Sequence, residues 1–243
     1  MKICAAQISP HRGDIPKNIE SHLKFIEHAS TVGANLIVFP ELSITGYEPE
    51  LAGKLAMEQD DSRLDVFRDK SNEENITICA GLPTIGESGI HITMAIFTPG
   101  ADTQFYSKQL LHPDELPYFI PWEDELLLLI ESKRIAPAIC YEALRPQHSE
   151  TAGSRNADIY LTSVVKSAEG IEKAYERFPD IAKQHSMTVL MSNAVGECEI
   201  FRSNGNSACW DDTGSLVGSL DDVSEGLLVY DLSTSEVKTI DLG

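Results

Sequence analysis

Three segments of the chain each place a chemically reactive side chain directly after an apolar stretch. Glu41 occurs in LIVFPELSITGYEP, Lys108 in FYSKQLLHPDELPYF, and Cys140 ends the run RIAPAIC. Catalytic groups often gather where strands end, because the backbone leaves the packed layers there. We therefore take Glu41, Lys108 and Cys140 as candidate catalytic residues.

A thiol, a carboxylate and an ammonium are together sufficient for acyl transfer. The carboxylate takes the thiol proton, and the ammonium stabilises the thiolate and the negative oxygen of a tetrahedral intermediate. Cysteine hydrolases usually use histidine as the base, but a carboxylate can replace it when burial raises its pKa. The apolar stretch before Glu41 would provide that burial. The set predicts a thioester formed on Cys140, with Glu41 as the general base.

Each residue also has an ordinary structural interpretation. A cysteine at the end of a strand is usually a small core residue, and a glutamate or lysine after a strand is usually a solvated loop charge. The combination of three such residues favours catalysis over three separate coincidences. The remaining cysteines, at positions 4, 79, 198 and 209, have no such partners in the sequence, and we assign them to packing.

The first forty residues predict a strand, a helix and a strand, which is typical of a layered α/β fold. Residues 2–9 and 35–41 are apolar runs, and the second is ended by Pro40. Residues 14–33 form the helix, with Asp14 as its cap and Gly33 at its end. Apolar residues recur there at helical spacing, namely Ile19, Leu23, Ile26 and Ala29.

The rest of the chain predicts more strands than helices. Helices are expected at 62–75, 147–157 and 168–186, the last with a break near Pro179. Strands are expected at 76–83 and 158–165, in hairpins at 91–109 and 126–140, and at 188–196, 204–212, 214–220 and 226–233, followed by a tail at 236–243. Pro137 suggests an edge or a bulge in its strand. About a dozen strands imply two mostly buried mixed sheets with helices on their outer faces, in a single domain spanning 1–243.

The composition excludes several function classes. The formal net charge of −19 argues against binding to nucleic acid or to an anionic membrane surface. It favours solubility, with a preference for cationic substrates as a weaker possibility. No nucleotide-binding glycine motif, zinc-binding HExxH or GxSxG elbow is present, and the seven histidines lack ligand spacing. We therefore expect neither a metal nor a cofactor.

Cysteine usage and hydropathy predict a cytoplasmic protein. The five cysteines are odd in number and include no CxxC pair, which argues against a disulfide framework. The stretch MKICAAQISP lacks the apolar run of a signal peptide, and no segment approaches the ~20 apolar residues of a membrane span.

The three motifs resemble those of the nitrilase superfamily, the carbon–nitrogen hydrolases. FPELSITGY is similar to the family's glutamate motif, YSKQLL to its lysine motif and AICYEALRP to its cysteine motif, in the same chain order. The first strand KICAAQIS and the late segments SNAVG and NGNSACWDDTGSLV extend the resemblance over nearly the whole chain. It implies a four-layer αββα sandwich, and a homodimer.

The resemblance also implies roles for individual residues. Cys140 is the nucleophile, Glu41 the base and Lys108 the group that stabilises the tetrahedral intermediate. Glu115 matches a second glutamate that positions the substrate or assists proton transfer. The backbone N–H of Tyr141 would share the oxyanion site with Lys108. The neighbouring motif residues, Tyr47 and Glu142, are further candidates for substrate binding.

One departure from the family pattern affects the expected substrate. Many amidase members continue after the cysteine as Tyr-Asp-x-Arg-Phe-Pro, whereas here Leu144 takes the arginine position and Arg145 is displaced by one. We expect hydrolysis of a small amide. The alternatives are a nitrile or an N-carbamoyl amine cleaved by the same three residues, or a ligand-binding member without turnover.

Overall fold

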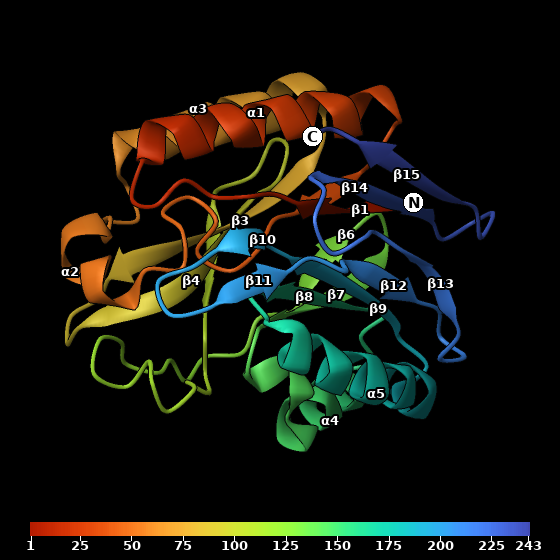
Figure 1. Ribbon diagram of the computed structural model, residues 1–243. Coiled ribbons are helices and arrows are strands. Elements are labelled where there is room, and N and C mark those ends of the chain that lie inside the picture. Colours follow the sequence, from red (N-terminus) through yellow and green to blue (C-terminus); the bar gives the residue numbers. More distant parts are fainter.

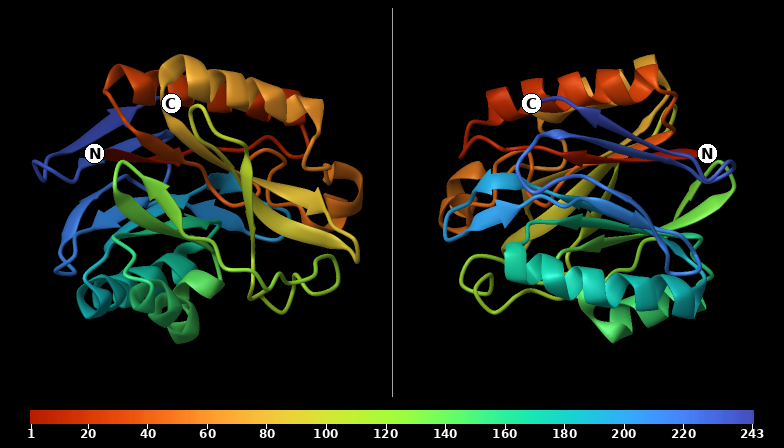
Figure 2. Two further views of the ribbon diagram at one scale, coloured as in Figure 1. Left: turned by 180° about the vertical axis from the view of Figure 1, so that it is seen from behind. Right: turned by 45° about the vertical axis from the view of Figure 1, so that its right-hand side comes forward.

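Two β-sheets lie face to face in the middle of the molecule, with helices covering the outer face of each (Figure 1). This arrangement is seen in a computed structural model that describes residues 1–243. Helices α1 and α3 cover one sheet, and α4 and α5 cover the other, as Figure 2 shows from two further directions. The predicted α/β sandwich of two mixed sheets is confirmed.

The first sheet has seven strands in the order β15-β14-β1-β2-β3-β4-β5. Its strands are β1 (Lys2–Gln7), β2 (Leu36–Val38), β3 (Thr77–Ile85), β4 (Ile90–Phe97), β5 (Gln104–Ser107), β14 (Gly226–Asp231) and β15 (Val237–Asp241). The central strands β1, β2 and β3 are parallel, and the outer strands pair antiparallel.

The second sheet has six strands in the order β13-β12-β9-β8-β7-β6. Its strands are β6 (Leu128–Ile130), β7 (Lys133–Ile139), β8 (Ile159–Val164), β9 (Thr188–Asn193), β12 (Ala208–Trp210) and β13 (Leu216–Ser219). Again the three strands β7, β8 and β9 are parallel. A separate hairpin is formed by β10 (Val195–Glu197) and β11 (Arg202–Asn204).

The helices are α1 (Ile15–Thr31), α2 (Ala52–Leu55), α3 (Asp65–Glu74), α4 (Pro146–Ser154) and α5 (Ala168–His185), with short 3-10 helices η1 (Pro49–Leu51), η2 (Ser62–Leu64) and η3 (Glu142–Leu144). Helix α1 begins as the sequence predicts, because the Asp14 side chain accepts a hydrogen bond from the backbone N–H of Lys17. It ends before Gly33, whose φ of 73° suits glycine. None of the helices is long and apolar enough to cross a membrane.

Strand alternation divides the core into three apolar layers. In β1, Ile3 and Ala5 face the space between the two sheets, whereas Cys4 and Ala6 face helix α1. A third cluster, between the second sheet and helices α4 and α5, contains Phe178 and Trp210. Because side chains of a strand alternate between its two faces and both faces are covered here, most central-strand residues are apolar. This rigid double layer fixes the strand ends at which the reactive side chains lie.

Some predicted elements differ from the structure. Residues 236–243, expected as a tail, include strand β15, because their backbone extends the sheet beside β14 although their side chains are largely exposed. The expected strand at 188–196 is divided into β9 and β10, and β11 and the short α2 were not predicted.

Two prolines also show where local rules give way to tertiary structure. Helix α5 does not break at Pro179, because its buried face, including Ala174, Phe178 and Ile181, holds it against the second sheet. Pro137 lies on β7 beyond the last residue that β6 pairs with. One side of β7 is thus locally a sheet edge there, although β7 itself is an internal strand.

Candidate active site

The ends of β2 and β7 bring the glutamate and the cysteine loops together across the two sheets. Glu41 follows β2 and Cys140 follows β7, and Ser163 of β8 contacts both loops. The Ser163 carbonyl accepts a hydrogen bond from the Cys140 N–H at 3.0 Å. Its hydroxyl donates to the carbonyl of Phe39 at 2.8 Å. One buried serine thus fixes the backbone on both sides of the site.

Cys140 has an unusual backbone conformation. Its φ of 49° lies in the left-handed region, which residues other than glycine rarely adopt and which costs conformational energy. The apolar strand before it and η3 after it hold this turn. The thiol is half-buried and donates a long hydrogen bond of 3.6 Å to the carbonyl of Val165. The strained turn therefore places a thiol at the end of a packed strand.

Lys108 lies between two carboxylates in the interior. Its Nζ donates to Oε1 of Glu41 and to Oε1 of Glu115, each at 2.7 Å, and all three side chains are at most 1% exposed. The lysine backbone is held by its N–H, which donates to the Ile92 carbonyl. The structure thus brings together the three residues from separate sequence motifs, with Glu115 as the fourth.

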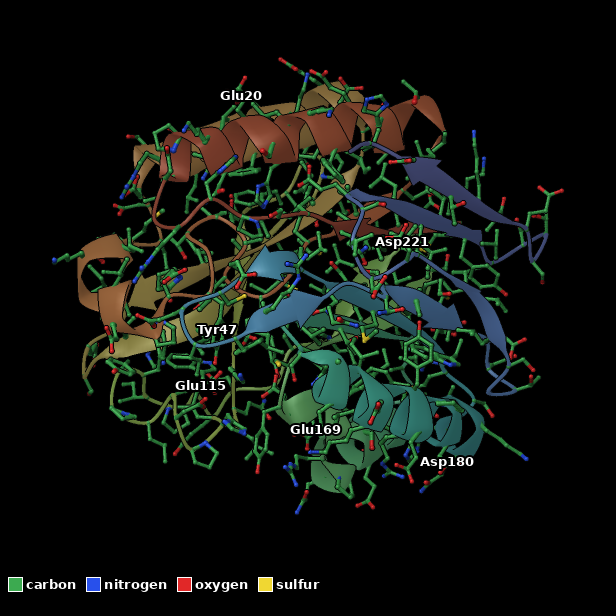
Figure 3. The ribbon with its side chains drawn as sticks, viewed as in Figure 1. Glu20, Tyr47, Glu115, Glu169, Asp180 and Asp221 are labelled. Carbon is green, nitrogen blue, oxygen red and sulfur yellow. The ribbon has the colours of Figure 1, made fainter.

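Glu115 is held by further donors. The Tyr47 hydroxyl donates to its Oε1 at 2.9 Å, and the backbone N–H of His112 donates to its Oε2 at 2.7 Å. Figure 3 shows the labelled Tyr47 and Glu115 near one another at one end of the sandwich. Tyr47 therefore orients Glu115 through a buried hydrogen bond.

Burial and charge together make Glu41 a suitable base. Burial raises the pKa of Glu41 to about 7, although the nearby Lys108 ammonium lowers it. Burial alone would lower the pKa of Lys108, but Glu41 and Glu115 outweigh this effect, so its pKa is raised and it stays protonated. The Oε2 of Glu41 is buried and has no hydrogen-bond partner. One oxygen of Glu41 is thus held by the lysine while the other is free to accept a proton.

The thiol is neutral in the resting site. Burial and then the Glu41 charge raise the pKa of Cys140 to about 11, whereas the ammonium groups of Lys166 and Lys108 lower it. A thiol with this pKa stays protonated at pH 7. Its attack on an electrophile therefore needs a base at the moment of reaction, and the free oxygen of Glu41 suits that task.

Tyr141, the residue after the cysteine, presents an unpaired backbone donor. Its N–H makes no hydrogen bond within the protein. Its ring contacts the guanidinium of Arg145, which lies 3.9 Å from the ring centroid, and makes a T-shaped contact with the ring of His112. The displaced arginine therefore supports the tyrosine by a cation–π contact instead of continuing the common family pattern.

Glu142 lies behind the site, with both carboxylate oxygens occupied. Oε1 accepts from the Tyr106 hydroxyl at 2.6 Å and from the Ile139 N–H at 2.8 Å. Oε2 accepts from the N–H groups of Gln109 and Leu110 at 2.6 and 3.2 Å. Sequence reasoning offered Glu142 for substrate binding, but these contacts are all with the protein. We interpret it as a residue that positions the two catalytic loops.

Sequence reasoning missed two residues of the site. Ser163 is inside an apolar strand and gives no sequence signal apart from its polarity. Lys166 is the second residue after β8, and its Nζ lies 3.8 Å from the Cys140 Sγ. It obeys the same rule of a reactive residue after an apolar strand that selected the other three, so that rule could have found it.

Neither a metal-binding cluster nor the hollow beside β4 and β5 involves Glu41, Lys108 or Cys140. No three His, Cys, Asp or Glu side chains are grouped so that they could hold a metal ion. A hollow of about 1000 Å³ beside β4 and β5 is lined by acidic residues and by His91 and Trp122, and the three candidate residues do not line it.

The sequence of nearly the whole chain matches one family model. Residues 2–241 match the model for "Carbon-nitrogen hydrolase". The chain belongs to the carbon–nitrogen hydrolase family. The resemblance carried by the three motifs is thereby confirmed.

Solved structures of an amidase share the fold of this carbon–nitrogen hydrolase. The NitN amidase of Nesterenkonia sp. AN1 is 25% identical, with a TM-score of 0.88 over 96% of this chain and 92% of that one. A variant of that amidase was solved with butyramide, at 23% identity and a TM-score of 0.87, covering 100% of this chain and 90% of that one. Another carries the acetamide moiety of fluoroacetamide on its active-site cysteine.

The curated relatives of this hydrolase differ in length and in the activities that their names give. Glutamine-dependent NAD(+) synthetase of Thermotoga maritima is 24% identical over 97% of this chain but only 42% of its own length. The chain thus spans less than half the length of the first relatives it matches. A Schizosaccharomyces pombe protein named "Probable nitrilase C965.09" is 23% identical over 98% of this chain and 90% of its own length.

Proposed function

We propose that this protein is an amidase that cleaves the carbon–nitrogen bond of a small amide through a thioester on Cys140. The observation that carries the proposal is the free, buried oxygen of Glu41 beside a carboxylate-bound Lys108. This geometry supplies a base of raised pKa and a fixed cation beside a neutral thiol. The amidase structures with the same fold and a covalently modified cysteine support it.

The first half of the reaction forms the thioester. Glu41 accepts the thiol proton while the Cys140 sulfur forms a bond to the amide carbon. The carbonyl oxygen becomes negative and is stabilised by the Lys108 ammonium and the Tyr141 N–H. The proton held by Glu41 then passes to the amide nitrogen, the carbon–nitrogen bond breaks, and ammonia or an amine leaves.

The second half hydrolyses the thioester. Glu41, again deprotonated, takes a proton from water as the water oxygen attacks the acyl carbon. The tetrahedral intermediate collapses, the carbon–sulfur bond breaks and the thiol regains its proton from Glu41. Glu115, bound to Lys108 and Tyr47, keeps the lysine in place through both halves.

A nitrile is the alternative substrate for the same residues. The thiol would add to the nitrile carbon to give a thioimidate, and water would release the acid and ammonia. The similarity to a protein named as a nitrilase favours keeping this alternative. An N-carbamoyl amine would release carbon dioxide as well, which identifies that class by its products. A nitrile and a primary amide both give the acid and ammonia, so those two are distinguished by which compound is consumed.

The deciding experiment is intact-mass spectrometry with a panel of small amides and nitriles, comparing wild type with Glu41→Gln. The glutamine variant lacks the base for both half-reactions, so it should release ammonia more slowly than wild type, and an acyl adduct that does form on Cys140 should persist because water is not activated. Ammonia release should be lost in Cys140→Ala while its circular dichroism spectrum is unchanged. Undiminished ammonia release by Cys140→Ala would overturn the proposal.

A non-catalytic ligand-binding role makes an opposite prediction about the thiol. In a working amidase, iodoacetamide should label Cys140 in preference to the buried Cys4, Cys79 and Cys209. Unselective labelling, together with no adduct and no ammonia across the panel, would favour a binding protein.

The proposal includes a homodimer built from single-domain subunits that work in the cytoplasm. The apolar cluster between the sheets joins residues from both halves of the chain, such as Ile3 and Leu190, which supports one domain spanning 1–243. All five cysteines are free thiols, which suits a reducing compartment. Light scattering coupled to gel filtration would test the dimer, and a monomer at micromolar concentration would contradict it.

A further inference from the structure

Lys166 is a second buried lysine beside the nucleophile, and the proposed reaction does not use it. It is the second residue after β8 and is 7% exposed, and Lys108 is the only other buried lysine in the protein. The Nζ of Lys166 lies 3.8 Å from the Sγ of Cys140. Helix α5 begins just after it. In Figures 1 and 3 the N-terminal end of α5 is the end that lies nearer to the labelled Tyr47 and Glu115.

The ammonium of Lys166 has no anionic partner in the protein. Lys108 donates to two carboxylates, whereas the only hydrogen-bond partner of Lys166 Nζ is the Cys140 sulfur. An ammonium has three donors, and a buried charge is costly unless it is paired. The thiol is not the missing anion, because burial raises the pKa of Cys140 to about 11 and leaves it protonated at pH 7.

The position of Lys166 is specified by its surroundings. Its N–H donates to the Asn193 side chain at 2.9 Å, and its carbonyl accepts from the Asn204 N–H at 2.9 Å. Gly170, in the first turn of α5, leaves room for the lysine stem. A Cβ at Gly170 would lie 3.1 Å from the Cβ of Lys166. These contacts hold the lysine in the interior, where its ammonium faces the nucleophile.

We propose that Lys166 is a specificity-determining residue that binds a carboxylate carried by the substrate, so that the preferred substrates are monoamides of short dicarboxylic acids. This inference rests on the amidase function proposed above. A carboxylate oxygen would lie about 2.8 Å from the ammonium. Because Nζ is so close to Sγ, the carboxylate would be only a few bonds from the acyl carbon attached to Cys140.

The charges of the site support an anionic substrate in spite of the acidic surface. With Glu41 deprotonated, as the proposed reaction requires, Glu41, Lys108 and Glu115 together carry one net negative charge, and Lys166 brings the site to neutrality. A neutral amide would leave the second ammonium unpaired, whereas a carboxylate would pair with it. The overall charge of −19 acts at longer range and is screened over about 8 Å at physiological salt. The inference thus favours an anionic substrate over the cationic one that the composition allowed.

The test compares amides of equal carbon number with and without a carboxylate. Succinamate is compared with butyramide, and glutaramate with pentanamide, in wild type and in Lys166→Gln. Wild type should prefer the anionic amide by roughly 10- to 100-fold in kcat/KM, the range expected for one charge-assisted hydrogen bond, and the variant should lose this preference. Equal kcat/KM values in wild type, or an equal loss for both amides in the variant, would overturn the inference.

The matched control removes an equal charge on the solvent side of α5. Lys173 pairs with Glu169 at the surface, so Lys173→Gln should keep the full preference for the anionic amides. Loss of the preference in this control would show a general charge effect and would overturn the role of Lys166.

A binding measurement separates this inference from the proposed hydrolysis. Succinate and glutarate should slow the alkylation of Cys140 by iodoacetamide in wild type but not in Lys166→Gln. Such protection without turnover of any amide would retain the carboxylate site and overturn the amidase. Turnover of amides without any protection by the dicarboxylates would retain the amidase and overturn the carboxylate site.

Discussion

The carboxylate of Glu142 accepts a hydrogen bond of 2.6 Å from the backbone N–H of Gln109, and so joins the loop after Cys140 to the loop after Lys108. The other oxygen of the same carboxylate accepts from the Ile139 N–H at 2.8 Å, next to Cys140. One buried side chain thus fixes the separation of Cys140 and Lys108. Its position explains why an acidic residue directly follows Tyr141 although its carboxylate makes no hydrogen bond with the Cys140 thiol.

Replacing Glu142 by glutamine should destabilise the protein and misplace the two loops. The amide nitrogen would face backbone N–H donors or the Tyr106 hydroxyl, so one or two buried donors would lose their acceptor. Each such loss costs about 1–3 kcal/mol, and we expect a decrease of about 2–3 kcal/mol in the free energy of unfolding. Urea denaturation measures it, with the exposed Glu150→Gln as the control. A stability equal to wild type would refute the positioning role.

The sequence predicted the strand ends well because they follow from alternation and from local stops. Pro40 ends the strand before Glu41, and apolar runs mark β7 and β8. The contacts made through tertiary structure were not predictable in this way. Glu142 and Ser163 act through atoms that are distant in sequence, and the periodicity of neither segment indicates a partner. Helix α5 likewise continues past Pro179 because of packing that only the folded chain shows.

The raised pKa of Glu41 predicts the acid limb of the pH–rate profile. In the proposed reaction the deprotonated carboxylate is the active base, so kcat/KM should fall tenfold per pH unit below about 7, the pKa to which burial raises Glu41. The Cys140 thiol, with a pKa raised to about 11, should give no limb in the neutral range. Steady-state rates across this range on a fixed amide measure both. An acid limb near 4.5, the ordinary value for glutamate, would show that Glu41 is not desolvated in solution.

The same shift predicts how stability depends on pH. Between 4.5 and about 7 the folded protein keeps a proton on Glu41 that the unfolded chain has lost. The stabilisation from this proton is complete below 4.5 and is lost as the pH rises through about 7. The free energy of unfolding of wild type, relative to Glu41→Gln, should therefore decline from about pH 5 to about pH 8. A difference that is constant with pH would contradict the raised pKa.

Removal of the Lys108 ammonium should leave two buried carboxylates facing one another. Lys108→Met deletes both ion pairs, and an uncompensated buried charge costs about 3–5 kcal/mol. Adding Glu115→Gln removes one of the two charges, so the double variant should regain a large part of the loss. Urea denaturation of wild type, both single variants and the double variant gives the coupling energy.

The matched control for this cycle is the exposed pair of Lys173 and Glu169. Both side chains are in solvent, so Lys173→Met should leave the unfolding midpoint unchanged within error. If the effects of Lys108→Met and Glu115→Gln on stability are additive, without recovery in the double variant, the Lys108 ammonium and the Glu115 carboxylate do not interact in solution.

Tyr47→Phe tests whether the orientation of Glu115 matters to the reaction. The substitution removes the 2.9 Å hydrogen bond to Oε1 of Glu115 but leaves Lys108 and the His112 N–H as its donors. We expect a loss of about 1 kcal/mol in stability and a fall in kcat of up to roughly tenfold.

Tyr175→Phe is the control, because it loses a single hydrogen bond, to the Asn206 carbonyl, that involves none of the candidate catalytic residues. If the two variants lose similar stability but only Tyr47→Phe loses kcat, the tyrosine positions Glu115 for catalysis. An unchanged kcat in Tyr47→Phe would show that Lys108 and His112 are sufficient to orient that carboxylate.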